Sequence, residues 1–444
     1  MRIAFTGNHR RTLIFAEIAK HLTALGHEVF WIATGSHEMS AILAPFQNIL
    51  TIDKTAKGSL DSFEKYSHIT VNGIIASDRI LQKMPYEKSV RYVSACCTQI
   101  KTFLADNNID LVFGEVTWAH EMVTAGLCRQ LDIPFLSPVN VRYPSDRFAF
   151  FEGVFQQNII AVSKEINLSE GIKLYDRFIN YGAMPFYMQQ VRKPLAKKVV
   201  YHIKRYMTGD TEDMTVPSMH RLISKSLRKF FSPKMPESKP SGRYIYLPLQ
   251  CTPESSIDIQ AGYYMDQLNF VKGVARSIPA DFKLAVKPHP LNSYSRRFYR
   301  ELSKIPSVEI ANAQSIRLIE YAAAVVSISS TACYEAGLCG IPAVVFCDTF
   351  YTDLPTVKRC GSIEKLRGTI TDAIDAYTEE NVVKTFLARL YSSSYEGFCE
   401  SPDVYADALS SSNIYKVSKA FEEVVSFYSS SKSATDDSIC SKLI

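Results

Sequence analysis

The sequence predicts an α/β fold of two domains, each a mainly parallel sheet covered by helices. The chain has 444 residues, more than a single hydrophobic core ordinarily supports. In both halves, short apolar runs of strand length alternate with segments whose apolar residues recur at helical spacing. This alternation is typical of Rossmann-like domains with parallel strands. We therefore expect two such domains facing a cleft, with a helical insertion between them and helices at the C-terminal end.

The first domain, predicted for residues 1–240, opens with a strand, a tight turn and a helix. The predicted strands are 2–6, 27–33, 109–115 and 133–138, and the predicted helices are 10–25, 86–106 and 119–130. Gly26 follows the first helix, where a glycine commonly ends one. The opening turn, Gly7-Asn8-His9-Arg10, lacks the G-x-G-x-x-G pattern. The turn therefore argues against dinucleotide binding.

Residues 163–240 interrupt the alternation and are expected to form a basic, largely helical insertion. Its positive side chains are Arg192, Lys193, Lys197, Lys198, Lys204, Arg205, Arg221, Lys225, Arg228, Lys229 and Lys234. Only Asp210, Glu212 and Asp213 oppose them within 192–234. A polar, proline-containing stretch closes the insertion and predicts a domain boundary near Ser241.

The second domain, predicted for residues 241–362, alternates regularly between strand and helix. The expected strands are 243–249, 282–287, 307–311, 325–329 and 342–347, and the expected helices are 264–277, 293–304, 315–323 and 331–339. The chain then reads as helical over 363–428. Residues 429–444 are rich in serine and predict a disordered tail.

Composition narrows the class of protein. No window reaches the roughly 18 unbroken apolar residues of a transmembrane helix, and the apolar run at the N-terminus is too short for a signal peptide. The ten cysteines show no C-x-x-C spacing, which favours buried thiols over disulfides or a zinc site. No other cluster has metal-ligand spacing, so we expect no metal. The expected compartment is the cytoplasm.

The clearest candidate site lies where the strand 325–329 runs into the next helix. Ser329, Ser330 and Thr331 stand at that junction, where free backbone N–H groups and the positive end of the helix dipole favour a phosphate. The alternative is that Ser330 only caps the helix. Glu335, one turn on, shares the face of Thr331 and could accept bonds from ribose hydroxyls or be a solvated glutamate.

Two other strand ends of this domain carry polar residues. His289 follows the strand 282–287 between two prolines, which suits a fixed phosphate donor or a general acid, although a lone histidine is more often structural. Lys287 beside it could add charge or point to solvent. Gln250 ends the strand 243–249 and could contact a base or sugar, or form a plain turn. Ligands of open α/β sheets bind at such carboxyl ends.

The first domain offers two candidates for a catalytic base. Glu115 stands at the carboxyl end of a strand, facing the expected cleft, and His9 lies in the opening turn. Either could deprotonate an acceptor hydroxyl, and either could instead serve as a structural partner.

These motifs together resemble a known family. YIYLPLQCTPESSI, a helix containing Asp266-Gln267, KLAVKPHP and SISSTACYEAGLCGIPAVVF occur in this order over about residues 243–350. The set resembles the capsule and surface-polysaccharide biosynthesis family, which includes Kdo transferases. Its HP and Ser-Ser motifs are also similar to those of bacterial sialyltransferases that use CMP-sugars.

The resemblance implies a GT-B fold, with the donor in the C-terminal domain and sugar transfer to a surface or capsule glycan. The absence of a D-x-D motif after a strand predicts that this transfer is metal-independent. The resemblance also implies that His289, Ser329 and Ser330 hold the phosphate of a CMP- or UDP-linked donor and that Glu335 touches its ribose. No separate cofactor is implied. The acidic base motif of sialyltransferases is not recognisable in this sequence, so Glu115 rests on its position alone.

Two other functions fit the sequence. One is a GT-B sugar-nucleotide 2-epimerase, which would need no acceptor. The other is a non-catalytic binder that uses the basic stretch 192–234. Anionic lipid at the inner face of the cytoplasmic membrane or an anionic glycan fits that stretch better than nucleic acid. A solvated helical insertion explains the same charges.

Overall fold

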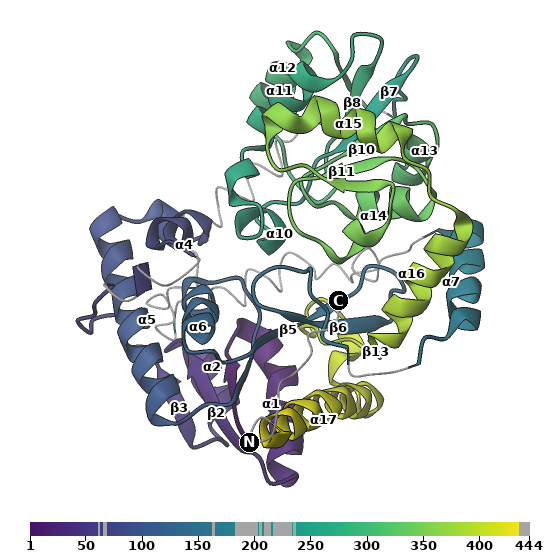
Figure 1. The fold of residues 1–444 in the computed structure, drawn as a ribbon. Helices are drawn as coiled ribbons and strands as arrows, with labels where there is room; N and C mark the ends of the chain where they lie inside the picture. The colour runs from purple at the N-terminus through teal and green to yellow at the C-terminus, as the bar shows by residue number, and fades with distance from the viewer. Residues whose placement is uncertain are drawn as a thin grey trace.

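The computed structural model describes residues 1–60, 63–64, 69–161, 165–182 and 237–434, with Ile203, Met207, Thr215 and Pro233 as single residues between. It holds two sheets, each with helices packed against it (Figure 1). We call the unit around the seven-stranded sheet the first domain and the unit around the six-stranded sheet the second domain. The predicted basic stretch 192–234 lies outside the described residues, apart from those single positions.

The first sheet has the order β13-β6-β5-β4-β1-β2-β3, and its pairs from β5 to β3 are parallel. Its strands are β1 (Arg2–Thr6), β2 (Glu28–Ala33), β3 (Asn48–Thr51), β4 (Leu111–Phe113), β5 (Phe135–Asn140), β6 (Arg147–Glu152) and β13 (Tyr395–Glu396). Its helical segments include η1 (His9–Arg11), α1 (Thr12–Ala24), α2 (His37–Leu43), α4 (Val71–Ser77), α5 (Tyr86–Asp106), α6 (Ala119–Gln130) and α7 (Leu168–Tyr181). Apolar runs buried on both faces explain the parallel pairing.

The second sheet is entirely parallel, with the order β12-β11-β10-β7-β8-β9. Its strands are β7 (Tyr244–Pro248), β8 (Lys283–Lys287), β9 (Val308–Ile310), β10 (Ala324–Val326), β11 (Ala343–Val345) and β12 (Val357–Arg359). Its helices are α10 (Ser255–Asp258), α11 (Gln267–Ser277), α12 (Arg296–Ser303), α13 (Ser315–Glu320), α14 (Thr331–Leu338) and α15 (Leu366–Asp375). The two separate α/β units confirm the predicted fold class.

The C-terminal region differs from the continuous helical stretch predicted for 363–428. Leu366, Ile370 and Ala373 of α15 pack in the core of the second domain, beyond the predicted boundary at 362. The helix α16 (Glu380–Ser392) then lies along α7, and β13 joins the first sheet antiparallel to β6 (Figure 1). The chain therefore returns to the first domain after the second is complete.

The last described helix, α17 (Ser411–Ala434), packs against α1 after the short helix η8 (Ala406–Leu409). Phe421 lies in one apolar cluster with Phe5, Phe15 and Phe113 of the first domain. The helix passes the predicted start of a disordered tail at 429, because its regular backbone continues to Ala434. Residues 435–444 lie outside the described part of the chain.

The carboxyl ends of the strands in the two domains face each other. Thr117, four residues after β4, contacts Ser255, which follows β7, with 3.1 Å between the two hydroxyl oxygens. Arg79 Nε of the first domain also lies 3.7 Å from Asp258 Oδ2 of the second. Since ligands of parallel sheets bind beyond the carboxyl ends, this junction is where we place the candidate site.

Candidate active site

Hydrogen bonds to Gln250 connect the carboxyl ends of three neighbouring strands of the second domain, β10, β7 and β8. Gln250 follows β7, which lies between β10 and β8 in the sheet. Its Oε1 accepts the backbone N–H of Ser329 at 2.8 Å, and its Nε2 donates to Ser329 Oγ at 2.9 Å. Gln250 and Ser329 are 6% and 1% exposed. The structure thus brings these two predicted residues together, and the amide of Gln250 serves to position Ser329.

Two residues that the sequence reasoning missed complete this connection. Gln267 brackets the backbone of Gln250, accepting from its N–H at 2.7 Å and donating to its carbonyl oxygen at 3.0 Å. Asn292, after β8, donates to the same carbonyl oxygen at 3.0 Å. The Asp-Gln pair at 266–267 was part of the family motif, whereas nothing in the sequence marks Asn292. The ends of β8, β7 and β10 are consequently held in one arrangement.

Ser330 is the N-cap of α14, and its hydroxyl accepts the backbone N–H of Ala332 at 3.2 Å. The capping alternative is therefore realised. Thr331 is the first residue of the helix, and no acidic side chain occupies its first turn. A helix start of this kind carries a partial positive charge. Direct phosphate contact by Ser330 and Thr331 stays a prediction.

The hydrogen bonds of His289 define which ring nitrogen carries the proton. Nδ1 accepts the backbone N–H of Leu291 at 3.3 Å, which assigns the proton of the neutral ring to Nε2. Burial, together with the charge of Lys287, lowers the pKa of His289 below its ordinary value of 6.5. His289 is therefore a neutral N–H donor at pH 7, which favours the role of phosphate donor over that of general acid.

Lys287 and Glu335 form a separate group with α13. Lys287 Nζ donates to Ser315 Oγ at 2.9 Å, and Tyr246 donates to the same oxygen at 3.3 Å. Burial raises the pKa of Glu335 to about 7, and the positive charge of Lys287 only partly offsets this. Burial likewise lowers the pKa of Lys287. Contact of either residue with a ligand stays a prediction.

In the first domain, Glu115 is held by one of its two carboxylate oxygens. Oε2 accepts from Asn8 Nδ2 at 3.0 Å and lies 3.2 Å from Arg11 Nη1. The Glu115 side chain is 31% exposed. Within the described residues Oε1 has no partner, so one oxygen is anchored and the other can accept a proton. This arrangement suits a general base.

His9 and Glu115 come together around the opening turn. His9 has a φ of 41°, a left-handed conformation that a histidine adopts uncommonly. Its ring packs edge-on against Trp118, with 5.2 Å between centroids. The Trp118 indole N–H in turn donates to Asn8 Oδ1 at 3.2 Å. Asn8 thus links the surroundings of His9 and Glu115, and the role of either residue as the base stays a prediction.

Arg11, Glu121 and Glu400 are further members of this group that the sequence reasoning missed. Arg11 is 5% exposed and lies 3.6 Å from Glu400 Oε2 as well as next to Glu115. Burial raises the pKa of Glu121, which accepts the backbone N–H groups of Thr117 and Trp118 at 2.9 and 3.0 Å. Glu400 follows β13, almost 400 residues after Arg11, so no local pattern could pair them. The buried guanidinium fixes two carboxylates from distant parts of the chain.

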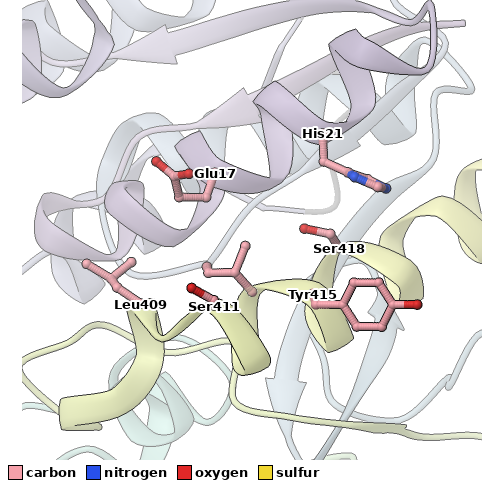
Figure 2. A pocket seen from close by; sticks show the side chains of 7 residues that line it. Glu17, His21, Leu409, Ser411, Tyr415 and Ser418 are labelled. Atoms are coloured by element: carbon pink, nitrogen blue, oxygen red, sulfur yellow. The ribbon is translucent and has the colours of Figure 1, made fainter.

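Two of the hollows on the described part of the surface lie away from the strand ends. The larger, of about 360 Å³, lies between α1 and the η8–α17 region and is lined by Glu17, His21, Leu409, Ser411, Ile414, Tyr415 and Ser418 (Figure 2). The smaller, of about 260 Å³, is lined by residues 280–283 and 306–307. Neither contains a predicted site residue, so the chemistry is assigned to the domain junction.

Comparisons with solved structures return broad but loose likenesses. The glycotransferase of kitacinnamycin is 11% identical, with 95% of this chain and 98% of that chain covered and a TM-score of 0.26. The UDP-GlcNAc 2-epimerase of Neisseria meningitidis is 12% identical over 96% and 100%, with a TM-score of 0.26. The β-Kdo 2,7 transferase KpsC of Thermosulfurimonas dismutans is 15% identical over 74% and 89%, with a TM-score of 0.35. At these scores we draw nothing further from them.

The sequence itself gives the more informative result. A search of curated proteins finds no match. Residues 175–367 match the family described as "Capsule polysaccharide biosynthesis protein". That range contains Gln250, His289, Ser329 and Glu335, so it carries the whole second-domain part of the candidate site. The resemblance predicted from the sequence is confirmed: this chain is similar to the capsule polysaccharide biosynthesis proteins over the segment that forms its second sheet.

Proposed function

We propose that the protein is a glycosyltransferase that moves a sugar from a nucleotide-activated donor to a surface or capsule glycan. The observation that carries the proposal is the connection between the two halves of the site. Ser329 is tied to Gln250, and Ser255 of the same loop region contacts Thr117, two residues from Glu115. These contacts support a donor-side phosphate site and an acceptor-side base at one junction.

In this proposal the second domain holds the donor. The start of α14 and the Nε2–H of His289 stabilise the negative charge that grows on the phosphate as the sugar–oxygen bond breaks. A CMP-linked acidic sugar of the Kdo or sialic acid type is favoured by the order of the motifs, and a UDP-sugar fits the same chemistry. No metal step is included.

The first domain supplies the acceptor side. Glu115 Oε1 takes the proton of the acceptor hydroxyl while the hydroxyl oxygen attacks the anomeric carbon of the donor sugar. The nucleotide leaves with the electrons of the broken sugar–oxygen bond. Arg11 and Asn8 hold the other oxygen of the carboxylate throughout. The bond made and the bond broken therefore lie between the two domains.

A ligand screen tests the donor side. Purified protein is titrated by calorimetry with CMP-Kdo, CMP-sialic acid, UDP-sugars and CDP-linked compounds. Binding of one activated sugar, followed by its consumption only when a glycan acceptor is added, is the expected result. Interconversion of free nucleotide sugars without any acceptor would assign the protein to the epimerases instead. Absence of binding to every donor would remove the proposal. Unchanged turnover in EDTA is the expected result for a metal-independent reaction.

Contact with a membrane surface through 192–234 is a separate part of the proposal. No helix in the described ranges is long and apolar enough to cross a bilayer. Flotation with liposomes rich in anionic lipid, at low and high salt, tests peripheral contact. Binding that weakens with salt is expected if the basic stretch meets the lipid surface.

A further inference from the structure

A short loop of the first domain is anchored in the second domain beside α14. Val141 and Tyr143 follow β5 and are 0% and 4% exposed. Both belong to an apolar cluster that also contains Tyr334 and Tyr351 of the second domain. The Tyr334 hydroxyl donates to the carbonyl oxygen of Tyr143 at 2.9 Å. Arg142, between these two anchors, is therefore held at a defined place against the second domain.

One aromatic ring separates Arg142 from the start of α14. The Arg142 guanidinium carbon lies 5.1 Å from the centre of the Tyr351 ring. The hydroxyl of Tyr351 donates to the carbonyl oxygen of Ser330, the N-cap, at 3.3 Å. Tyr351 also stacks on Tyr334, with 5.2 Å between ring centres. Packing thus fixes both the ring and the guanidinium above it.

The charge of Arg142 acts on groups around the helix start. Burial raises the pKa of Cys333 and Cys347, and the charge of Arg142 offsets part of this rise. Glu254, from the loop after β7, is a nearby carboxylate. Burial raises its pKa, and the charge of Arg142 partly offsets that rise. An arginine beside the positive end of a helix dipole is an unfavourable pairing of like charges. An anion in front of both would make this pairing favourable.

We propose that Arg142 binds the phosphate of the nucleotide donor, so that a residue of the first domain completes the donor site of the second. The inference rests on the proposed function, because it assigns the phosphate of that donor to a specific cation. A planar guanidinium that lies over the Tyr351 ring can bind two phosphate oxygens at once along its edge. Arg142 would then add a charged contact from the first domain to the phosphate contacts of the helix start and His289 in the second domain.

The test compares CMP with cytidine on the full-length protein. Arg142→Met removes the charge and keeps an unbranched apolar side chain at this position. We expect this variant to bind CMP at least about tenfold more weakly, the loss of a charge-assisted hydrogen bond, and to bind cytidine as wild type does. Arg243→Met is the matched control, because the Arg243 guanidinium carbon also lies over an aromatic ring, 4.4 Å from the centre of Phe282, but Arg243 precedes β7 and so lies at the opposite end of the sheet from the candidate site. It should leave both affinities unchanged.

Three results would overturn the inference. Wild-type affinity of Arg142→Met for CMP would show that the guanidinium does not meet the phosphate. Equal weakening of CMP and cytidine would show a structural role only. Failure of the wild type to bind CMP, UDP or CDP would remove the proposed function, and this inference with it. If Arg142→Met does not fold, Arg142→Lys replaces it. The lysine should weaken CMP several-fold and leave cytidine unchanged, and equal loss of both would again contradict the inference.

Discussion

Gln250 and Ser329 bind each other at two points, the amide oxygen to the backbone N–H at 2.8 Å and the amide nitrogen to the hydroxyl at 2.9 Å. The contact joins the ends of two adjacent parallel strands, so it sets where α14 begins. From the sequence, this side chain could contact a base or sugar or form a plain turn. In the structure it bonds to Ser329, and its contact with a ligand stays a prediction. The position of a ligand bound at Ser330 therefore depends on the contact between Gln250 and Ser329.

Replacing Gln250 by alanine should therefore damage both stability and binding. The variant leaves the buried Ser329 N–H without its acceptor, while the Ser329 hydroxyl keeps its bond to the carbonyl oxygen of Ser256 at 3.4 Å. Loss of the partner of a buried N–H costs about 1–3 kcal/mol of unfolding free energy. Urea denaturation measures this loss, and nucleotide affinity should fall with it. Gln82→Ala, at an exposed position, is the control and should stay within about 0.5 kcal/mol of wild type. Unchanged stability of Gln250→Ala would contradict the role given to the contact.

Glu115→Gln should abolish most of the turnover while leaving donor binding intact. The amide keeps the size of the side chain but cannot take a proton, so kcat should fall about 100-fold or more. Steady-state transfer assays, with donor affinity measured in parallel, separate the two effects. Glu396→Gln, which breaks an exposed pair with Lys416, serves as the control. Full activity of Glu115→Gln would exclude this carboxylate as the base.

His289→Ala should weaken nucleotide binding by about 10- to 100-fold, the loss of one hydrogen bond to a charged group. His289→Gln, whose amide N–H can replace the Nε2–H, should recover part of it. Because burial and Lys287 lower the pKa of His289 below 6.5, the ring is neutral above pH 7. The affinity lost in His289→Ala should therefore be the same at pH 7 and pH 8.5. A loss that shrinks steeply over this range would mean that the charged ring is the ligand.

Glu335 should make stability depend on pH in a defined window. Burial raises its pKa from 4.5 to about 7, so between these values the folded state binds more protons than the unfolded state. The contribution of Glu335 to the free energy of unfolding is complete below pH 4.5 and is lost as the pH rises through about 7. Urea denaturation at pH 5, 6, 7 and 8 should show this fall in wild type and a flatter profile in Glu335→Gln. Equal slopes for the two proteins would show that Glu335 titrates normally.

Much of the second domain could be predicted from the sequence, because its strands are short apolar runs between clear helix starts. The site was harder, since side-chain partners are set by topology. Ser329 and Ser330 were visible as a strand-to-helix junction, but the amide that fixes Ser329 comes from the neighbouring strand. Arg142 follows no motif at all.

The first domain shows the same limit. The helix Tyr86–Asp106 matches its predicted bounds, since its apolar face is long and regular. The strand β13 has two residues, too few to show an alternation of apolar and polar side chains in the sequence. It forms by pairing with β6 at the edge of the sheet. Glu400 reaches Arg11 through that pairing. Contacts between distant segments of this kind have no local signal.

The return of the chain to the first sheet affects how the protein can be synthesised. The ring of Phe421 lies 4.6 Å from that of Phe113 and 6.3 Å from that of Phe5, so the core of the first domain needs residues from near both ends of the described chain. On the ribosome, the second domain, whose strands lie within 244–359, can fold while α17 is still unmade. The aromatic cluster around Phe5 and Phe113 lacks Phe421 until α17 has been made, so the core of the domain that is made first is completed after the strands of the second domain.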